Sequence, residues 1–212
     1  MKTAIIGLGN IGRQVAQNLL DSGQKVIVAD HGRSRAQDFA SASGGNAQAL
    51  ADADAIAQTD VIVMAISFDA IKEFLAEYGS KLRGKILVDP SNAVAPDGNG
   101  GFRKTIAPEQ SAGEVIAALL PPGVRLVKAF GTLTAASLRS GARRTPEPNV
   151  LFYASDDRQA GDVVRDLIKA SGFEALRVGG MDQAIRIEAF GDLHEVGKLG
   201  RLVTAKEAAA VV

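Results

Sequence analysis

The stretch Gly7-Leu8-Gly9-Asn10-Ile11-Gly12 decides how the first half of the chain folds. It follows the apolar run 2–6 and opens a segment in which apolar residues recur at helical spacing, so it predicts a tight turn from a strand into a helix. The first glycine permits the turn, the second lets a ligand approach the backbone, and the third lets the helix pack closely on the strand. This pattern predicts a site for the pyrophosphate of a dinucleotide at the start of the helix.

Asp30 ends a second predicted strand, residues 25–29, and stands 18 residues after Gly12. A carboxylate that binds the adenosine ribose is expected roughly 20 residues after the glycine turn. Asp30 favours NAD, because a carboxylate accepts hydrogen bonds from the ribose hydroxyls and repels a 2′-phosphate. Arg33 and Arg35 favour NADP, because a guanidinium pairs with that phosphate, unless both arginines are only the solvated start of a helix. These residues leave the choice between NADP and NAD open.

Short apolar runs alternate with stretches of helical period, which predicts an α/β fold of the Rossmann type, a doubly wound and mostly parallel sheet. Further strands are predicted over residues 60–66, 85–89, 125–129 and 150–153, with a weak one near 46–50. Ser111 and Glu114 predict a capping box at the start of another helix. We expect residues 1–180 to form the nucleotide-binding domain. Residues 181–212 are expected to form a short helical C-terminal cap within the same compact unit.

The composition restricts the chemistry that the chain can supply. It has 212 residues, 24 basic and 24 acidic side chains and no cysteine, which excludes a disulfide scaffold, a thiolate metal site and a thiol nucleophile. Zero net charge gives no field that attracts nucleic acid or a membrane surface. No signal-peptide pattern is visible, and no apolar run approaches the ~18 residues of a membrane span. These features are typical of a soluble cytoplasmic protein whose chemistry arrives with bound coenzymes.

Residues 90–108 and 131–149 form two long irregular segments, each after a predicted strand. Ligands bind at the carboxyl ends of the strands in an open parallel sheet, so we expect both segments near the site, although their individual roles stay open. A chain of this length has no room for a large substrate domain, so the second pocket is expected to be built from loops and the tail. Arg143 and Arg144 either attract an anionic coenzyme tail or belong to a solvated loop.

Four segments together resemble the NADPH-dependent reductases of the deazaflavin coenzyme F420: the glycine turn, VIVMAISF (61–68), ILVDPSNA (86–93) and RLVKAFGTL (125–133). The chain is also similar to the reductase module of the STEAP metalloreductases, and the resemblance covers residues 1 to about 200. It implies NADP or NAD as the cofactor and F420 or a flavin as a second, small-molecule substrate. By position, the resemblance places the pyrophosphate on Leu8, Gly9, Asn10 and Ile11. It places the adenosine ribose near Asp30, His31 and Arg35 and the nicotinamide ribose beside Ile66 and Ser67. The nicotinamide end would lie against Asn92, Ala129 and Phe130.

The chain departs from this family at two positions. Members often carry Ser-Arg directly after the second strand to hold a 2′-phosphate, whereas this chain has Asp30-His31-Gly32. The asparagine that commonly follows the Lys-Ala-Phe stretch is Gly131 here. The first departure bears on the choice of nucleotide, and the second bears on the acceptor pocket.

Hydride transfer between a nicotinamide and a flavin-like ring requires the protein mainly to hold two heterocycles face to face and to exclude water. We therefore predict no catalytic acid, base or nucleophile and no metal ligand. Neither tyrosine is followed four residues later by the lysine of a Tyr-x-x-x-Lys pair. Phe68, Phe130 and Leu133 are equally good candidates for the walls of a ring pocket and for ordinary packing in the core.

Other functions remain open at this stage. Reduction of a small carbonyl or imine would use Lys128 as the proton donor, although a lysine that reaches solvent at a strand end is the favoured interpretation. His194 either contacts the second substrate or, as favoured, lies at an exposed helix end. A module that senses nucleotide without turnover is a third hypothesis. The tail is the candidate for a homodimer interface, unless its apolar residues Ile185, Ile187, Phe190 and Leu193 pack on their own sheet.

Overall fold

The computed structural model describes residues 1–212, with an eight-stranded sheet at its centre. The strand order is β10-β9-β8-β5-β4-β1-β2-β3, and all neighbours are parallel except β8 and β9. The chain winds outward from β1 in both directions, so the turn after β1 lies where the strand order reverses, and the predicted Rossmann-type fold is confirmed. The strands of this sheet are β1 Thr3–Ile6, β2 Val26–Ala29, β3 Ala47–Ala49, β4 Val61–Met64, β5 Ile86–Asp89, β8 Arg125–Lys128, β9 Val150–Ala154 and β10 Glu174–Gly179.

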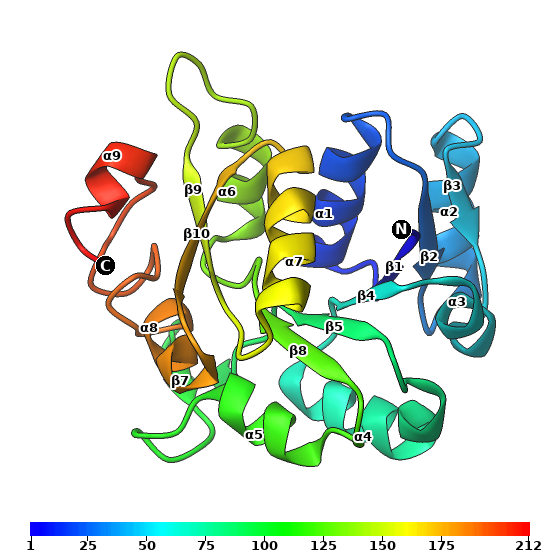
Figure 1. Cartoon of the computed structure of the whole chain (residues 1–212), viewed down its shortest axis with the longest axis horizontal. Helices are drawn as coiled ribbons and strands as arrows, with labels where there is room; N and C mark the ends of the chain where they lie inside the picture. The colour runs from blue at the N-terminus through cyan, green and yellow to red at the C-terminus, as the bar shows by residue number, and fades with distance from the viewer.

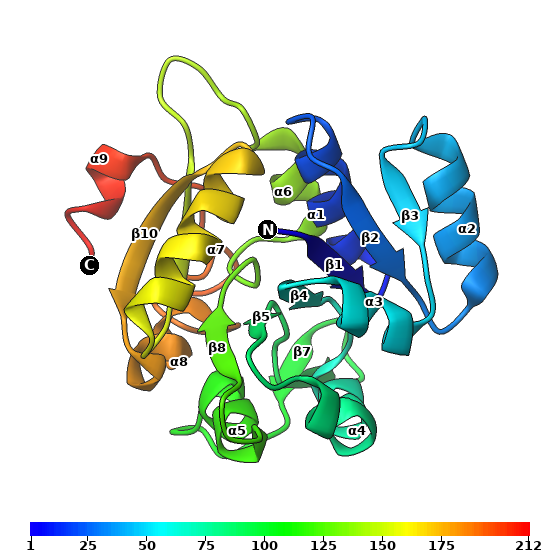
Figure 2. The same cartoon turned by 45° about the vertical axis from the view of Figure 1, so that its right-hand side comes forward.

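Helices cover both faces of the sheet (Figures 1 and 2). Neighbouring residues of a strand point to opposite faces: Ile5 packs with residues of α1, α2 and α7, whereas Ile6 packs with residues of α3, α4 and α5. None of the helices combines the length and the apolar character that a membrane crossing requires. The helices are α1 Asn10–Leu20, α2 Arg33–Ala42, α3 Asp52–Gln58, α4 Phe68–Tyr78, α5 Ala112–Leu119, α6 Ala135–Ser140, α7 Arg158–Ala170, α8 Ala184–Ile187 and α9 Ala205–Ala208, with 3₁₀ turns at Gly79–Lys81 and Met181–Gln183.

Four of the observed elements, β6, β7, α6 and β10, were not predicted from the sequence. The segment 90–108 contains an antiparallel hairpin of β6 (Val94–Pro96) and β7 (Phe102–Lys104), and its glycine-dense centre forms the connection. The segment 131–149 contains α6, which Thr134 caps through its side chain. The edge strand β10 was not predicted because its sequence, EALRVG, is charged and only partly buried.

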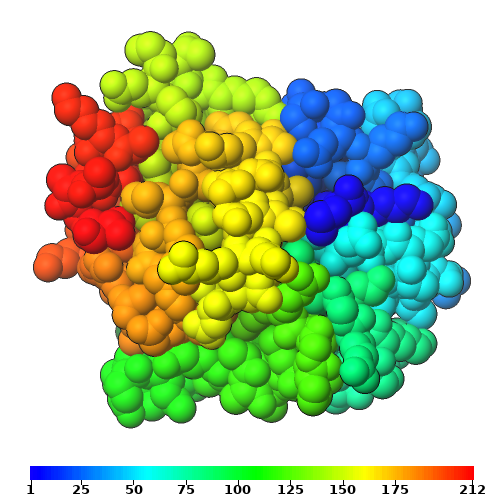
Figure 3. All heavy atoms as spheres, viewed as in Figure 1, coloured from blue at the N-terminus to red at the C-terminus, as the bar shows by residue number.

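The C-terminal segment forms a layer over the antiparallel edge of the sheet. It contains only short helical stretches, namely a 3₁₀ turn and the four-residue helices α8 and α9. Ile187 and Leu193 pack with Phe152 of β9 and Val178 of β10, whereas Phe190 is exposed. Figure 3 shows this segment in orange and red on the side of the molecule opposite to β2 and β3.

Candidate functional site

The turn between β1 and α1 requires glycine at two positions. Gly7 has a φ of +91°, and a Cβ there would lie 2.5 Å from the carbonyl oxygen of Ala65. A Cβ on Gly12 would lie 1.9 Å from the carbonyl oxygen of Gly7. Gly9 differs, because the space around its missing Cβ is open and it begins α1 without a side-chain cap. The amide end of α1 is therefore open to an anion, as the sequence predicts.

Asp30 joins the glycine turn to the loop before α2. Its Oδ2 accepts a hydrogen bond of 2.7 Å from the Leu8 N–H, and its Oδ1 accepts one of 3.0 Å from the Gly32 N–H. The Arg35 guanidinium lies 3.4 Å from Oδ2, and the Asp30 side chain is 7% exposed. Both carboxylate oxygens thus already have protein partners. His31, Arg33 and Arg35 are exposed beside it.

The other residues assigned to the nucleotide lie along the same edge of the sheet. Ile66 contacts the glycine turn, and Ser67 caps α4 by accepting a hydrogen bond from the Ala70 N–H. Ala129 and Phe130 are fully buried beneath the surface, and Phe130 has a φ of +64°. Phe130 and Phe68 belong to the two large core clusters, so they are packing residues.

An apolar pocket of about 350 Å³ opens beside the nicotinamide end of the predicted nucleotide site. It borders Ile11 and Asn92, which the resemblance assigns to the nucleotide, and Leu133, a candidate for the wall of a ring pocket. Its walls come from the start of α1, the β6–β7 hairpin, the loops after β5 and β8, and the tail. The sequence did not identify Phe190, expected only at an interface or in the core, as a wall residue, nor did it identify Pro90, Val94, Phe102, Thr134, Ala189 and Val196. Of these, Val94 and Phe102 had a signal in the glycine-rich turn between them.

Asn92 and Gly131 form the junction beneath this pocket. The Asn92 side chain donates to the Gly131 carbonyl at 3.1 Å and accepts from the Ala189 N–H at 2.6 Å. One amide therefore connects the loop after β5, the loop after β8 and the tail. A Cβ on Gly131 would lie 2.6 Å from the Pro90 carbonyl oxygen, so a side chain does not fit at this position without a shift of the backbone.

His194 is buried, and the prediction of an exposed helix end is wrong. Its Nε2 lies 3.0 Å from the Gly131 carbonyl oxygen, and its Nδ1 accepts a hydrogen bond of 3.1 Å from the Val196 N–H. This pattern assigns the proton to Nε2 and a neutral ring. Burial lowers the pKa of His194, which outweighs the opposite effects of the Gly131 carbonyl and Glu195. His194 borders the pocket but has no free nitrogen.

Lys128 is 1% exposed, so the favoured interpretation, in which it reaches solvent, is wrong. Its Nζ lies 2.8 Å from Asp89 Oδ2 and 3.5 Å from Glu188 Oε1, and it donates to the Ser91 carbonyl. Burial alone lowers the pKa of Lys128, but the carboxylates of Asp89 and Glu188 outweigh it and raise the pKa above its ordinary value. Lys128 does not line the pocket, so it is unsuited to protonate a substrate there.

Glu188 extends this ion cluster to α5. Its two carboxylate oxygens accept hydrogen bonds of 2.7 and 2.8 Å from the N–H groups of Ala112 and Gly113. A carboxylate from the tail therefore occupies the positive end of α5, in addition to the predicted capping box of Ser111 and Glu114. The cluster fixes the tail against the sheet directly before Ala189 and Phe190.

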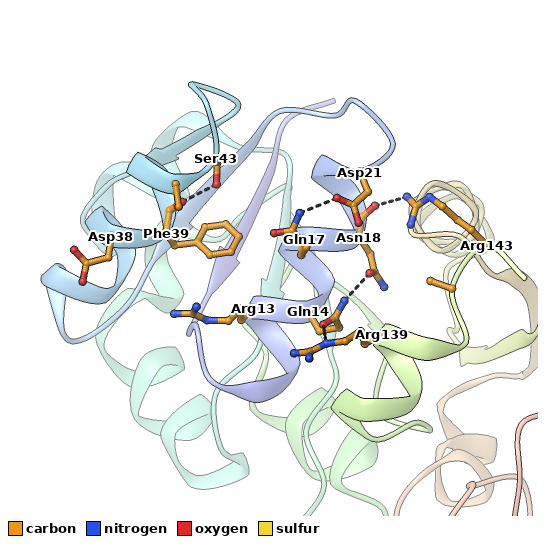
Figure 4. A pocket seen from close by; sticks show the side chains of 12 residues that line it. Arg13, Gln14, Gln17, Asn18, Asp21, Asp38, Phe39, Ser43, Arg139 and Arg143 are labelled. Atoms are coloured by element: carbon orange, nitrogen blue, oxygen red, sulfur yellow. Dashed lines mark hydrogen bonds between the residues drawn. The ribbon is translucent and has the colours of Figure 1, made fainter.

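A larger groove of about 530 Å³ lies between α1, α2 and α6 (Figure 4). Several of its polar side chains have partners within the protein: Arg139 donates to the Gln14 side chain, and Arg143 donates to the backbone carbonyl of Asn18. Arg13 lies over the Phe39 ring at 5.9 Å. The groove follows the length of α1 and contains none of the residues assigned to the nucleotide. We therefore place the candidate site at the smaller pocket.

Comparisons with known proteins find similar oxidoreductases. A sequence model of the family "NADP oxidoreductase coenzyme F420-dependent" matches residues 2–93. The metalloreductase STEAP3 of Rattus norvegicus is 29% identical over 188 residues, which cover 89% of this chain but 36%, about a third, of that protein. The F420-dependent NADP reductase of Methanothermobacter thermautotrophicus is 29% identical over 199 residues, which cover 89% of this chain and 85% of that protein.

A solved structure extends the likeness to the tail. The hypothetical protein SMa0349 from Sinorhizobium meliloti superimposes with a TM-score of 0.84 at 26% identity, over 96% of this chain and 95% of that one. Together, these likenesses confirm the family resemblance that the four sequence segments indicate.

Proposed function

We propose, from the premise that this chain is an NAD(P)-dependent oxidoreductase similar to the coenzyme F420-dependent NADP oxidoreductases, that it transfers hydride between NADP(H) and a flavin-like ring. The observation that carries the proposal is the position of the apolar pocket. It borders Ile11 and Asn92, to which the resemblance assigns the pyrophosphate and the nicotinamide end, so a ring bound there would adjoin a nicotinamide held in that way.

The residues present fit a dinucleotide. The amide end of α1 has no side-chain cap, and open space surrounds the position of a Cβ on Gly9. The hydroxyls of Ser91 and Thr132 are buried without a protein partner on the two loops that border the nicotinamide end. Buried polar groups normally have partners, so these hydroxyls are available to a ligand.

We infer a preference for NADP over NAD. Asp30 uses both carboxylate oxygens on backbone N–H groups and lies near Arg35, so its charge is compensated within the protein. Arg33, Arg35 and the uncapped start of α2 at Gly32 are exposed beside it and provide the positive groups that a 2′-phosphate needs. The family description and the name of the archaeal relative also specify NADP.

The bound nicotinamide supplies the hydride chemistry, and the side chains orient the rings and exclude water. Leu133, Val94 and Ala189 keep the pocket apolar, and Asn92 fixes the loops around it. No side chain of the pocket is free to move a proton, because the ring nitrogens of His194 are both occupied. Reduction of a simple carbonyl or imine is disfavoured, because Lys128 is paired with carboxylates away from the pocket.

The test is a spectroscopic assay of NADPH oxidation with F420, FMN, riboflavin or a quinone as the acceptor, under anaerobic conditions. We expect turnover with at least one acceptor and tight binding of NADPH. Binding of NADPH without turnover of any acceptor would favour the nucleotide-sensing module instead.

We also propose that the protein forms a homodimer and lies in the cytoplasm. Light scattering of the purified protein measures whether it is a dimer.

A further inference from the structure

The apolar pocket contains no charged side chain. Its twelve lining residues are aliphatic, aromatic or glycine, apart from Asn92, Thr134 and His194. His194 is neutral in its observed hydrogen-bond pattern. A substrate group that carries a charge would lose hydration here without gaining a counterion, which is costly.

The polar groups of the pocket are also occupied by the protein. The Asn92 amide bonds to Gly131 and Ala189, and the Thr134 hydroxyl accepts from the Ser137 N–H at 3.2 Å and donates to the Ser137 hydroxyl at 3.3 Å. The Gly131 carbonyl already accepts from both Asn92 and His194. The second N–H of the Asn92 amide is the one side-chain donor of the pocket that remains free, and it carries no charge, so most of the charge that hydride transfer creates has to be delocalised by the substrate itself.

The mouth of the pocket presents large apolar side chains to solvent. Phe102 is 63% exposed, Phe190 is 54% exposed and Val196 is 62% exposed. Phe102 comes from the hairpin and Phe190 from the tail, so two aromatic rings from distant segments border one opening. Aromatic side chains favour stacked or tilted contacts with planar rings, which such an opening provides.

We propose that this pocket selects an uncharged, planar, conjugated two-electron acceptor, a quinone or an unphosphorylated flavin ring, and discriminates against the same ring with an attached charge. The proposal rests on the proposed function, because NADPH supplies the electrons. One hydride, a proton with two electrons, passes from the nicotinamide to the acceptor ring. NADPH becomes NADP⁺, and the reduced ring takes one further proton from solvent.

The first experiment compares matched acceptors that differ only in an attached anionic group. Riboflavin is compared with FMN, and 1,4-naphthoquinone with its 2-sulfonate, each with NADPH under anaerobic conditions and with an enzyme-free blank. The expected kcat/KM is about tenfold higher for the uncharged member of each pair, which corresponds to about 1.4 kcal/mol. A result in which only the quinone pair or only the flavin pair is turned over identifies the ring class.

The second experiment adds a positive charge at the mouth with Val196→Lys. Val196 is exposed, so this variant is expected to fold and to bind NADPH as the wild type does. The preference for riboflavin over FMN should fall or invert in this variant. The matched control is Leu119→Lys on α5, an exposed apolar residue (49%) that does not line the pocket and should leave the preference unchanged.

The outcomes separate the two proposals. Equal or better turnover of the charged acceptors by the wild type overturns the selectivity and leaves hydride transfer intact. An unchanged acceptor preference in Val196→Lys also contradicts the selectivity. If NADPH binds but no acceptor is reduced, the proposed function itself fails.

Discussion

At the scale of single residues, Lys128 is a buried cation whose partners come from three parts of the chain. Asp89 ends β5, Ser91 lies in the following loop, and Glu188 belongs to the tail. Because Asn92 and Ala189 directly follow two of these partners, the cluster determines how closely the pocket walls approach. Lys128 therefore acts as a positioning residue.

Lys128→Met should destabilise the fold strongly. It leaves Asp89 and Glu188 buried without their cation, and removal of one partner of a buried ion pair costs about 3–5 kcal/mol. Urea denaturation measures the loss. Lys169→Met is the matched control, because it removes only a surface pair with Glu174 and should cost less than about 1 kcal/mol. If Lys128→Met unfolded at the same urea concentration as the wild type, the ion cluster would not stabilise the fold.

Arg35 and Asp30 test the choice of nucleotide. Arg35→Ala should weaken the binding of NADPH about tenfold and leave the binding of NADH nearly unchanged, because a charge-assisted hydrogen bond to the 2′-phosphate is lost. Asp30→Ala should weaken the binding of both nucleotides, because it removes the acceptor of the Leu8 N–H and so loosens the glycine turn. Fluorescence titration measures both constants, with Arg144→Ala as the exposed control. Selective loss of NADH binding in Asp30→Ala would instead mean that Asp30 binds the ribose hydroxyls.

At the scale of elements, the turn between β1 and α1 contains one glycine that the fold requires, Gly12, and one that we expect only nucleotide binding to require, Gly9. Gly12→Ala should cost about 1–3 kcal/mol of stability, because its Cβ would overlap the Gly7 carbonyl oxygen at 1.9 Å. Gly9→Ala should retain the wild-type stability within about 0.5 kcal/mol, because the φ of −68° at Gly9 suits any residue and its surroundings are open. The same variant should bind NADPH more weakly. Thermal unfolding and nucleotide titration of both variants check the contrast. Equal loss of stability in both would refute it.

The predicted elements differ from the observed ones for identifiable reasons. The central strands were predictable because residues such as those of VIVM (61–64) are buried on both faces and read as continuous apolar runs. The strand β10 was not, because an edge strand retains charged residues. The surroundings of Lys128 and His194 were not predictable either, since their partners Glu188 and Gly131 lie 60 or more residues away in sequence. Short-range patterns do not encode such contacts.

At the scale of the whole molecule, the tail holds the second half of the site in place through hydrogen bonds. The His194 ring contacts the Gly131 carbonyl, and the Glu195 N–H donates to the Thr132 carbonyl at 3.2 Å. Glu195 also accepts a hydrogen bond from the Thr134 N–H. The tail is therefore part of the pocket as well as a cover for the sheet edge.

Stability should fall as the pH falls below 6.5, the ordinary pKa of histidine. Burial lowers the pKa of His194 in the folded state. As the pH falls, the unfolded chain therefore binds a proton at this histidine before the folded protein does, and this favours unfolding. The loss of stability begins at the ordinary pKa and is complete below the folded-state pKa. Melting temperatures across this range should fall less steeply for His194→Gln than for the wild type. His31→Gln, at an exposed position, is the control and should match the wild-type slope. Parallel slopes for His194→Gln and the wild type would refute the assignment.

The contact between Glu188 and α5 also sets an order of events during synthesis on the ribosome. The glycine turn is made among the first residues, whereas Glu188 is made near the end of the chain. Until then, the N–H groups of Ala112 and Gly113 and one side of Lys128 lack their partner. A nascent chain therefore contains the complete glycine turn long before it contains all walls of the apolar pocket. A translation product that stops before residue 188 retains the sequence of the turn, but its α5 lacks the Glu188 carboxylate and its Lys128 keeps only Asp89 and the Ser91 carbonyl as partners.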